Sequence, residues 1–143
     1  MTKNNITRTM KIYSILAFLT TGLLFQACSG NDCSRFKSGN FVYHIKGQGD
    51  DFSFFINRND SIQTEVNSKT GDISKVKVTW IDDCNYELRF LESTAIYVEP
   101  ILSLRKNSVL KNEIVSSTND YYIFKTTQDN SEIIFTDTLW IMK

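Results

Sequence analysis

From Phe41 onward, apolar and polar residues alternate along the chain with a period of two, which is the pattern of strands that bury one face. Turn-forming residues interrupt this alternation at 47–51, 59–60, 68–72 and 82–85. The segments between them predict five consecutive strands, at residues 41–46, 52–56, 62–66, 75–80 and 86–90. Because the connecting turns are short, we expect these strands to form an antiparallel meander.

The clearest alternation lies on both sides of the turn at 82–85. Lys75, Lys77 and Thr79 occupy one face of the strand before this turn, and the other face of that strand is apolar. The turn places the apolar face of the following strand in the same register. Six side chains are therefore expected to share one buried face: Val76, Val78, Trp80, Tyr86, Leu88 and Phe90.

The second half of the chain begins with a segment, near residues 95–107, that follows neither the strand nor the helix period. Pro100 suits the first turn of a short helix, so we expect a loop with a helical insertion here. Strand patterns return at 109–115, 121–127 and 132–142. The predicted fold is all-β, a single antiparallel meander of about eight strands that forms a strongly curved sheet or small barrel. A two-sheet sandwich is the alternative.

The first 27 residues have the organisation of an export signal. Lys3, Arg8 and Lys11 give a basic start, and an apolar run of about 14 residues follows at 12–25. Such a run is too short to cross a hydrocarbon core of about 30 Å as a permanent helix. Residues 1–27 are therefore predicted to be a lipoprotein signal peptide.

The segment Phe25-Gln26-Ala27-Cys28 resembles a lipobox, the site at which bacterial lipoproteins are cleaved and lipidated. Ala27 supplies the small residue that precedes the lipidated cysteine, whereas Phe25 and Gln26 depart from the usual leucine and small residue. We expect Cys28 to carry lipid, residues 28–35 to form a tether, and residues 36–143 to form one β domain. This domain would be anchored to the outer membrane of the cell envelope, on its periplasmic or surface face. The alternative is a secretory signal cleaved near Ala27, with Cys28 an ordinary thiol.

The charge of the exported chain argues against a polyanionic partner. After Cys28 the sequence holds 13 Lys and Arg against 16 Asp and Glu, and the basic residues are scattered. Nucleic-acid binding requires basic residues gathered in a patch or stripe. We therefore expect no nucleic-acid partner. The expected partners are the membrane, through the lipid, and a small apolar ligand or an envelope protein.

Two cysteines remain if Cys28 is lipidated. Cys33 and Cys84 would then be a pair in an oxidising compartment, where disulfides persist. A catalytic thiol is the alternative, but it needs a basic or positively charged neighbour. Asp32 precedes Cys33 and Asp83 precedes Cys84, and nearby carboxylates disfavour a thiolate, so the sequence favours a disulfide.

Arg58, Gln63 and Glu65 flank the predicted turn at 59–60 and allow two interpretations. If they lie on the concave side of a curved sheet, they form a polar site within an apolar bowl, which is the composition of a ligand-binding pocket. If they face solvent, they form an exposed cross-strand network that stabilises the hairpin slightly. The exposed network is the simpler interpretation.

The sequence contains no recognisable catalytic or metal-binding constellation. His44, the only histidine, is expected to face solvent from a strand, and no Gly-x-Ser-x-Gly motif presents a serine. The adjacent acids at 50–51 and 82–83 lack the spacing of a calcium loop. Glu65 and Asp82 would act as acid and base only if the fold brought them together in a cleft. We expect no catalytic residues, no metal and no cofactor.

Three segments, in order, resemble a pattern of short Bacteroidota-type lipoproteins of unknown function. They contain Phe-Lys-x-Gly-x-Phe after Cys33, Arg-x4-Gln-x-Glu from Arg58, and Trp-x-x-Asp-Cys-x-Tyr from Trp80. The resemblance covers about 55 residues, from Cys33 to Leu88. It implies an envelope location and the Cys33–Cys84 disulfide, and it implies no mechanism.

These observations together predict a lipid-anchored β domain that is a non-enzymatic binding or interaction module. An envelope hydrolase with paired carboxylates is the alternative. A cavity lined by apolar side chains would favour ligand binding, whereas a filled interior would favour a structural or protein-interaction role.

Cys28→Ser should abolish lipidation, because the lipid is attached through the thiol of that residue. Metabolic labelling with a palmitate analogue is expected to mark the wild-type protein and not the variant. Equal labelling of both proteins would contradict the lipid anchor.

Overall fold

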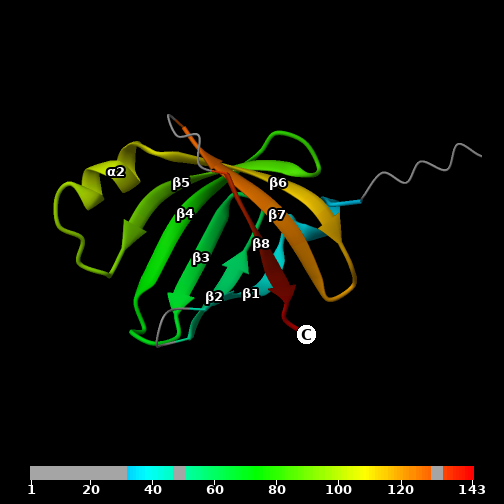
Figure 1. Cartoon of the computed structure of the whole chain (residues 1–143), viewed down its shortest axis with the longest axis horizontal. Helices are drawn as coiled ribbons and strands as arrows, with labels where there is room; N and C mark the ends of the chain where they lie inside the picture. Colours follow the sequence, from blue (N-terminus) through cyan, green and yellow to red (C-terminus); the bar gives the residue numbers. More distant parts are fainter. Residues whose placement is uncertain (1–31, 47–50, 130–133) are drawn as a thin grey trace, which may run out of the picture. The chain divides into compact units, whose positions relative to one another are not determined.

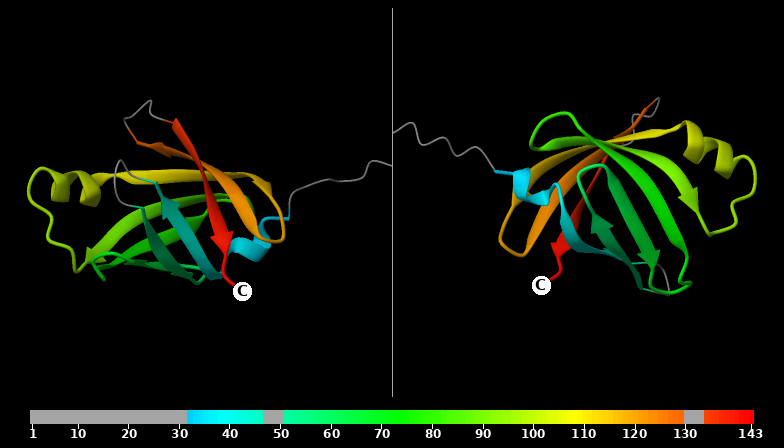
Figure 2. Two further views of the ribbon diagram at one scale, coloured as in Figure 1. Left: turned by 60° about the horizontal axis from the view of Figure 1, so that its bottom comes forward. Right: turned by 180° about the vertical axis from the view of Figure 1, so that it is seen from behind.

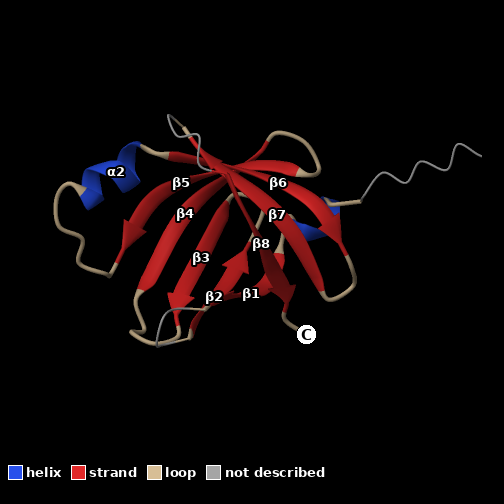
Figure 3. Ribbon diagram, in the orientation of Figure 1, coloured by secondary structure: helices blue, strands red, loops and turns tan. Residues whose placement is uncertain are grey.

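The structure, a computed structural model, describes residues 32–46, 51–129 and 134–143. These residues form one closed barrel in which the order of strands around the barrel follows their order in the chain (Figures 1 and 3). The eight strands are β1 (Gly39–Ile45), β2 (Phe52–Arg58), β3 (Ile62–Asn67), β4 (Ile73–Trp80), β5 (Asn85–Ser93), β6 (Val109–Ser117), β7 (Tyr121–Gln128) and β8 (Ile134–Ile141). Strand β1 pairs antiparallel with both β2 and β8, and the second pairing closes the sheet.

The predicted all-β meander of eight strands is confirmed, and the sheet is a small barrel rather than a sandwich. The insertion expected near residues 95–107 contains one short helix, α2 (Ile101–Asn107), which starts directly after Pro100. No helix within the described ranges is long and apolar enough to cross a membrane. The predicted signal peptide, residues 1–27, and the predicted lipidation site, Cys28, lie outside the described residues.

The two ends of the barrel differ (Figures 1 and 2). At one end the short 3-10 helix η1 (Ser34–Phe36, cyan) enters the barrel, and at the other end lies α2. Phe36 projects from η1 into the interior and is 1% exposed. Gly39 then starts β1 with a φ of 143°, a value at which a residue with a side chain would be strained. The helix η1 thus plugs one end, which we call the closed end.

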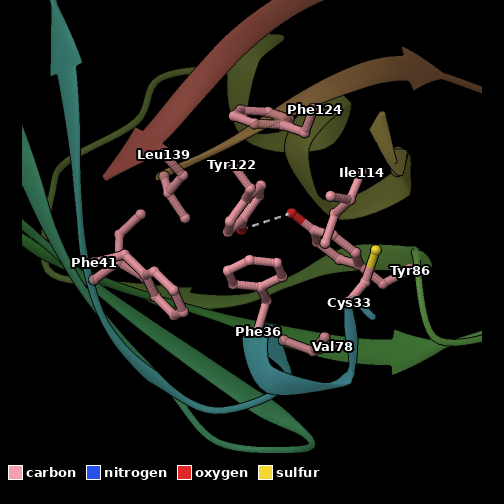
Figure 4. Close-up of a cluster of buried hydrophobic side chains, with 10 residues drawn as sticks. Cys33, Phe36, Phe41, Val78, Tyr86, Ile114, Tyr122, Phe124 and Leu139 are labelled. Carbon is pink, nitrogen blue, oxygen red and sulfur yellow. Dashed lines mark hydrogen bonds between the residues drawn. The ribbon is translucent and has the colours of Figure 1, made fainter. Parts of the chain in front are cut away.

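Aromatic side chains fill the closed end around the plug (Figure 4). The ring of Phe36 lies 4.7 Å from that of Tyr122, and the ring of Phe41 lies 5.9 Å from it in an edge-on arrangement. The hydroxyl groups of Tyr122 and Tyr86 are 3.3 Å apart, which gives each a hydrogen-bond partner. Val78, Ile114 and Leu139 complete this packed layer.

A disulfide between Cys33 and Cys84 fastens the plug to the turn between β4 and β5, as the sequence predicts. Cys33 is fully buried, and Lys37, just after η1, forms a 2.7 Å ion pair with Asp83 in the same turn. The predicted tether, residues 28–35, is therefore too long, and the predicted domain start at residue 36 is too late. Cys33 and η1 belong to the barrel because the disulfide and the burial of Phe36 hold them there.

The apolar face predicted around the turn at 82–85 is confirmed by the strand register. Val76 lies opposite Phe90, Val78 opposite Leu88, and Trp80 opposite Tyr86 in the β4–β5 pair. All six side chains face the interior, but only Val78 and Tyr86 are fully buried. Val76, Leu88 and Phe90 are partly exposed because they line a part of the interior that is not filled, as described below, whereas Trp80 lies at the closed end against Tyr86.

Replacing both Cys33 and Cys84 with alanine should lower the free energy of unfolding by about 4 kcal/mol, the chain-entropy value for a loop of this length. The loop spans 51 residues. Denaturant unfolding of the oxidised wild-type protein, the reduced wild-type protein and the double variant measures the effect. Reduction should reproduce the loss in the wild-type protein and leave the variant unchanged. An unchanged unfolding midpoint in the variant would contradict a stabilising role for the disulfide.

Candidate functional site

Away from the plug, the inward-facing side chains leave a cavity of about 500 Å³ inside the barrel. This volume lies within the range of about 300 to 1,000 Å³ that is usual for small-molecule sites. The apolar part of its wall includes Ile56, Val76, Leu88, Leu110, Phe124 and Leu139. These residues come from six different strands, so the cavity occupies the barrel interior rather than a surface groove.

The helix α2 lies at the end of the cavity opposite the plug, which we call the mouth. Ile101, Leu104 and Arg105 contribute to the cavity wall. None of the helix residues is buried, and Leu104 is 59% exposed. The Arg105 guanidinium lies 4.3 Å above the ring of Tyr97. The mouth therefore combines exposed aliphatic side chains with one stacked cation.

A row of three polar side chains, Arg58, Gln63 and Glu65, runs from the closed end into the cavity. Arg58 ends β2 and lies directly opposite Gln63 on β3, while Glu65 lies opposite Ile56. Asn59 holds the tight turn between the two strands, because its side-chain oxygen accepts hydrogen bonds from the backbone of Ser61 and Ile62. This register points the polar row toward the barrel interior. All three residues line the cavity.

Arg58 is the most deeply buried charged residue of the row, at 3% exposure. Its Nε donates to Gln63 Oε1 at 2.6 Å, its Nη1 donates to the carbonyl of Phe36 at 3.3 Å, and its Nη2 donates to Tyr86 Oη at 3.4 Å. The guanidinium remains protonated in proteins. Its charge is therefore held by neutral acceptors at the boundary between plug and cavity.

Three aromatic rings also surround the Arg58 guanidinium. Its central carbon lies 4.7 Å from the ring centre of Tyr86, 5.3 Å from that of Phe41 and 5.9 Å from that of Trp80. Cation–π contacts stabilise a cation by about 0.5–1 kcal/mol at exposed sites and by about 2 kcal/mol or more where the cation is desolvated. They explain how the barrel accommodates a buried charge.

Of the cavity-lining residues that the structure describes, Glu65 is the one with a carboxyl group. Its Oε1 accepts a 2.6 Å hydrogen bond from Gln63 Nε2. Burial raises the pKa of Glu65 above its ordinary value, and this effect outweighs the lowering by the Gln63 hydrogen bond and the charges of Arg58 and Arg105. Gln63 therefore joins the two ends of the row, accepting from Arg58 and donating to Glu65.

The opposite wall of the barrel carries a second set of polar groups. Thr126 Oγ1 donates to Asn112 Oδ1 at 2.6 Å, and both residues are buried. Nearer α2, Gln128 Nε2 donates to Ser108 Oγ at 2.6 Å. None of the motifs in the sequence includes these four residues. The alternation of the strands indicates that two of them face the interior. Asn112 is two residues from the buried Ile114, and Thr126 is two residues from the buried Phe124.

The simpler interpretation of Arg58, Gln63 and Glu65, an exposed cross-strand network, is wrong. Arg58 and Gln63 are buried inside the barrel, and Glu65 is partly buried at the cavity wall. The reason is the alternation of β2, which places Arg58 on the same face as the buried Ile56. The structure thus brings the three predicted residues together on the concave side of the sheet.

The structure does not bring Glu65 and Asp82 together. Glu65 lies opposite Ser74, whereas Asp82 follows the far end of β4. The strand from Ser74 to Trp80 alone spans about 20 Å. Asp82 is exposed and accepts hydrogen bonds within its own turn, from the backbone of Cys84 and Asn85. These two residues therefore cannot share a catalytic step.

His44 faces solvent, as predicted, with Ser53 Oγ 2.8 Å from its Nδ1.

Comparison with known proteins gives no relative from which a function for this cavity could be inferred. No family model matches the chain, and neither curated proteins nor solved structures give a match. The fold and the site define a class on their own: a closed up-and-down β-barrel with a packed closed end and a ligand-sized internal cavity. Function must be argued from the site, because such barrels support many functions.

Glu65→Gln should raise the thermal stability of the protein in a pH-dependent way. Because the pKa of Glu65 is raised in the folded state, the folded protein retains the proton to a higher pH than the unfolded chain. Wild-type stability should therefore fall as pH rises from the ordinary pKa of 4.5 toward the folded-state pKa. The neutral glutamine keeps the acceptor for Gln63 and avoids this loss.

Melting temperatures of both proteins across acidic and neutral pH measure this effect. The two curves should converge below the ordinary pKa and separate above it, with the variant more stable. A constant difference between the curves at all pH values would contradict a buried, titrating Glu65.

Proposed function

We propose that this protein is a lipid-anchored module of the cell envelope whose barrel binds one small amphipathic ligand without chemical conversion. The observation that carries the proposal is the cavity of about 500 Å³ inside a barrel whose other end is packed. A barrel of eight strands is just wide enough to be filled by side chains or to hold one small ligand. In this chain side chains fill the closed end, whereas the mouth end leaves room for one small ligand.

The chemistry of the cavity wall supports an amphipathic ligand rather than a purely apolar one. Aliphatic and aromatic side chains from most strands would contact a hydrocarbon part. The polar row and the Asn112–Thr126 pair supply a small number of placed hydrogen-bonding groups. Ligand sites usually combine these two features, since the apolar wall provides affinity and the polar groups fix orientation.

Two observations favour binding in the cavity over the other roles. Because β1 pairs with β8, the described sheet offers no free edge for strand addition by a partner protein. The separation of Glu65 and Asp82 leaves the paired-carboxylate hydrolase without its required geometry. These observations therefore favour ligand binding in the cavity over strand addition by a partner protein and over hydrolysis by paired carboxylates.

The envelope location rests on the leader at residues 1–27 and on the predicted lipidation of Cys28. The Cys33–Cys84 disulfide is compatible with that location, because structural disulfides persist in oxidising compartments. A barrel held at the membrane would bind, carry or buffer a ligand that is poorly soluble in water.

Filling the cavity should abolish ligand binding without unfolding the barrel. Leu88→Trp places a larger side chain in the cavity wall, whereas Arg89→Trp places the same side chain on the outer face of the same strand. Both are made in the full chain carrying Cys28→Ser, which prevents lipidation. The probe is Nile red, a neutral dye that fluoresces in apolar surroundings.

Titration of the protein into the dye measures affinity, and circular dichroism confirms the fold. We expect saturable binding to the parent protein and to Arg89→Trp, and binding at least about tenfold weaker, or 1.4 kcal/mol, in Leu88→Trp. Equal affinity in all three proteins would show that the dye binds outside the cavity. The absence of binding to the parent protein would contradict the proposed function.

A further inference from the structure

The described residues of the cavity wall include two guanidinium groups and one carboxyl group. Arg58 lies at the inner end and Arg105 at the mouth, and Glu65 lies between them. Among the described residues, neither arginine forms an ion pair with a carboxylate. The hydrogen-bond partners of Arg58 are an amide oxygen, a backbone carbonyl and a phenol, and Arg105 stacks on Tyr97.

A buried charge without a direct counterion is unusual, because transfer of a charge out of water is costly unless it is paired. The neutral acceptors and aromatic rings around Arg58 reduce this cost but leave its positive charge in place. The remaining charge acts in a medium of low dielectric constant, where its attraction for an anion is much stronger than in water. Among the described residues, Glu65 on the cavity wall and Asp137, which accepts a 2.7 Å hydrogen bond from the cavity-lining Tyr43, are the acidic groups of this region. Neither forms an ion pair with Arg58, so no described carboxylate cancels the arginine's positive charge by direct contact.

We propose that the ligand of this cavity is an anionic amphiphile, with its anionic group at the inner end of the cavity beside the polar row and its hydrocarbon tail directed toward the mouth. This inference rests on the proposed function and adds the ligand class and its orientation.

The observations favour the inner end over the mouth for the anionic group. Arg58 is buried and held in place by three hydrogen bonds, so its field is fixed and poorly screened. Arg105 is an exposed side chain on a helix with no buried residue, and water and salt weaken its attraction. The tail would then pass Val76 and Leu88 and leave the barrel between the aliphatic residues of α2.

A matched pair of probes tests the charge of the ligand. Laurate and lauryl alcohol have the same hydrocarbon tail and differ in the head group, and laurate is anionic at neutral pH. Affinities are measured by displacement of Nile red from the full chain carrying Cys28→Ser. We expect laurate to bind at least about tenfold more tightly than the alcohol, which corresponds to about 1.4 kcal/mol.

Glu65→Gln tests the position of the anionic group without removing the buried arginine. This variant keeps the hydrogen bond to Gln63 but removes the carboxylate that Glu65 contributes to the described part of the wall. At mildly alkaline pH it should increase the affinity for laurate several-fold and change the affinity for lauryl alcohol by a smaller factor, because only laurate carries a charge that the Glu65 carboxylate repels. Lys77→Gln, which removes one charge from the outer face of β4, is the control and should change neither affinity.

The outcomes separate this inference from the proposed function. If both probes bind with equal affinity, the barrel binds ligands but the inference of an anionic ligand is wrong. If Arg105→Gln removes the preference for laurate and Glu65→Gln has no effect, the anionic group lies at the mouth and the proposed orientation is overturned. If neither probe displaces dye that Leu88→Trp shows to be bound in the cavity, the inference of an anionic amphiphile is wrong and the proposed function stands. The proposed function fails if the dye itself does not bind the parent protein.

Discussion

The contact on which the rest of the structure depends is the burial of the Arg58 guanidinium at the junction of plug, wall and cavity. One nitrogen donates to the carbonyl of Phe36 in the plug, another to the side chain of Gln63 on the neighbouring strand, and a third to Tyr86 across the barrel. A buried charge with these partners requires all three elements to be in place at once. Removing any one of them would leave one N–H group of the guanidinium without an acceptor in a medium that does not solvate it. The arginine therefore couples the closure of one end of the barrel to the arrangement of polar groups in its cavity.

This coupling divides the interior into two regions with different physical character. Between the guanidinium and the closed end, aromatic rings form a closely packed core (Figure 4). The Cys33–Cys84 disulfide fastens this core to the turn between β4 and β5. On the mouth side of the guanidinium, the same alternation of inward and outward residues continues, but the inward side chains do not meet across the barrel. The packed region provides the stability that allows the other region to remain open, since a domain of this size has only a small total stability. The closed end of the barrel thus contains the packed core, and the other end contains the proposed ligand site.

Local patterns in the sequence were sufficient to predict the strands, the helical insertion and the disulfide. Alternation with a period of two depends only on neighbouring residues, and the cysteine pair followed from their number and the expected compartment. The side of the sheet that Arg58 and Gln63 face was predicted wrongly, because polar residues in a strand usually face water. Arg58 lies two residues from the inward-facing Ile56, and Gln63 pairs with Arg58, so the alternation of the strands indicates that both face the interior. On the opposite wall, Asn112 lies two residues from Ile114 and faces the interior for the same reason. The cavity itself depends on how eight strands close and how far side chains reach across, and neither quantity is encoded in any short segment.

The disulfide at the plug also determines how the barrel would respond to mechanical force. A pull on the chain before Cys33 divides at that residue between the backbone of η1 and the covalent link to Cys84. The second route transmits the load directly to the turn between β4 and β5, on a part of the wall distant in sequence from β1. Tension therefore does not have to pass through the hydrogen bonds between β1 and β8, the pairing that completes the cylinder. A load applied before Cys33 would therefore enter the barrel at two separate points of its closed end, the start of β1 and the turn between β4 and β5, rather than at β1 alone.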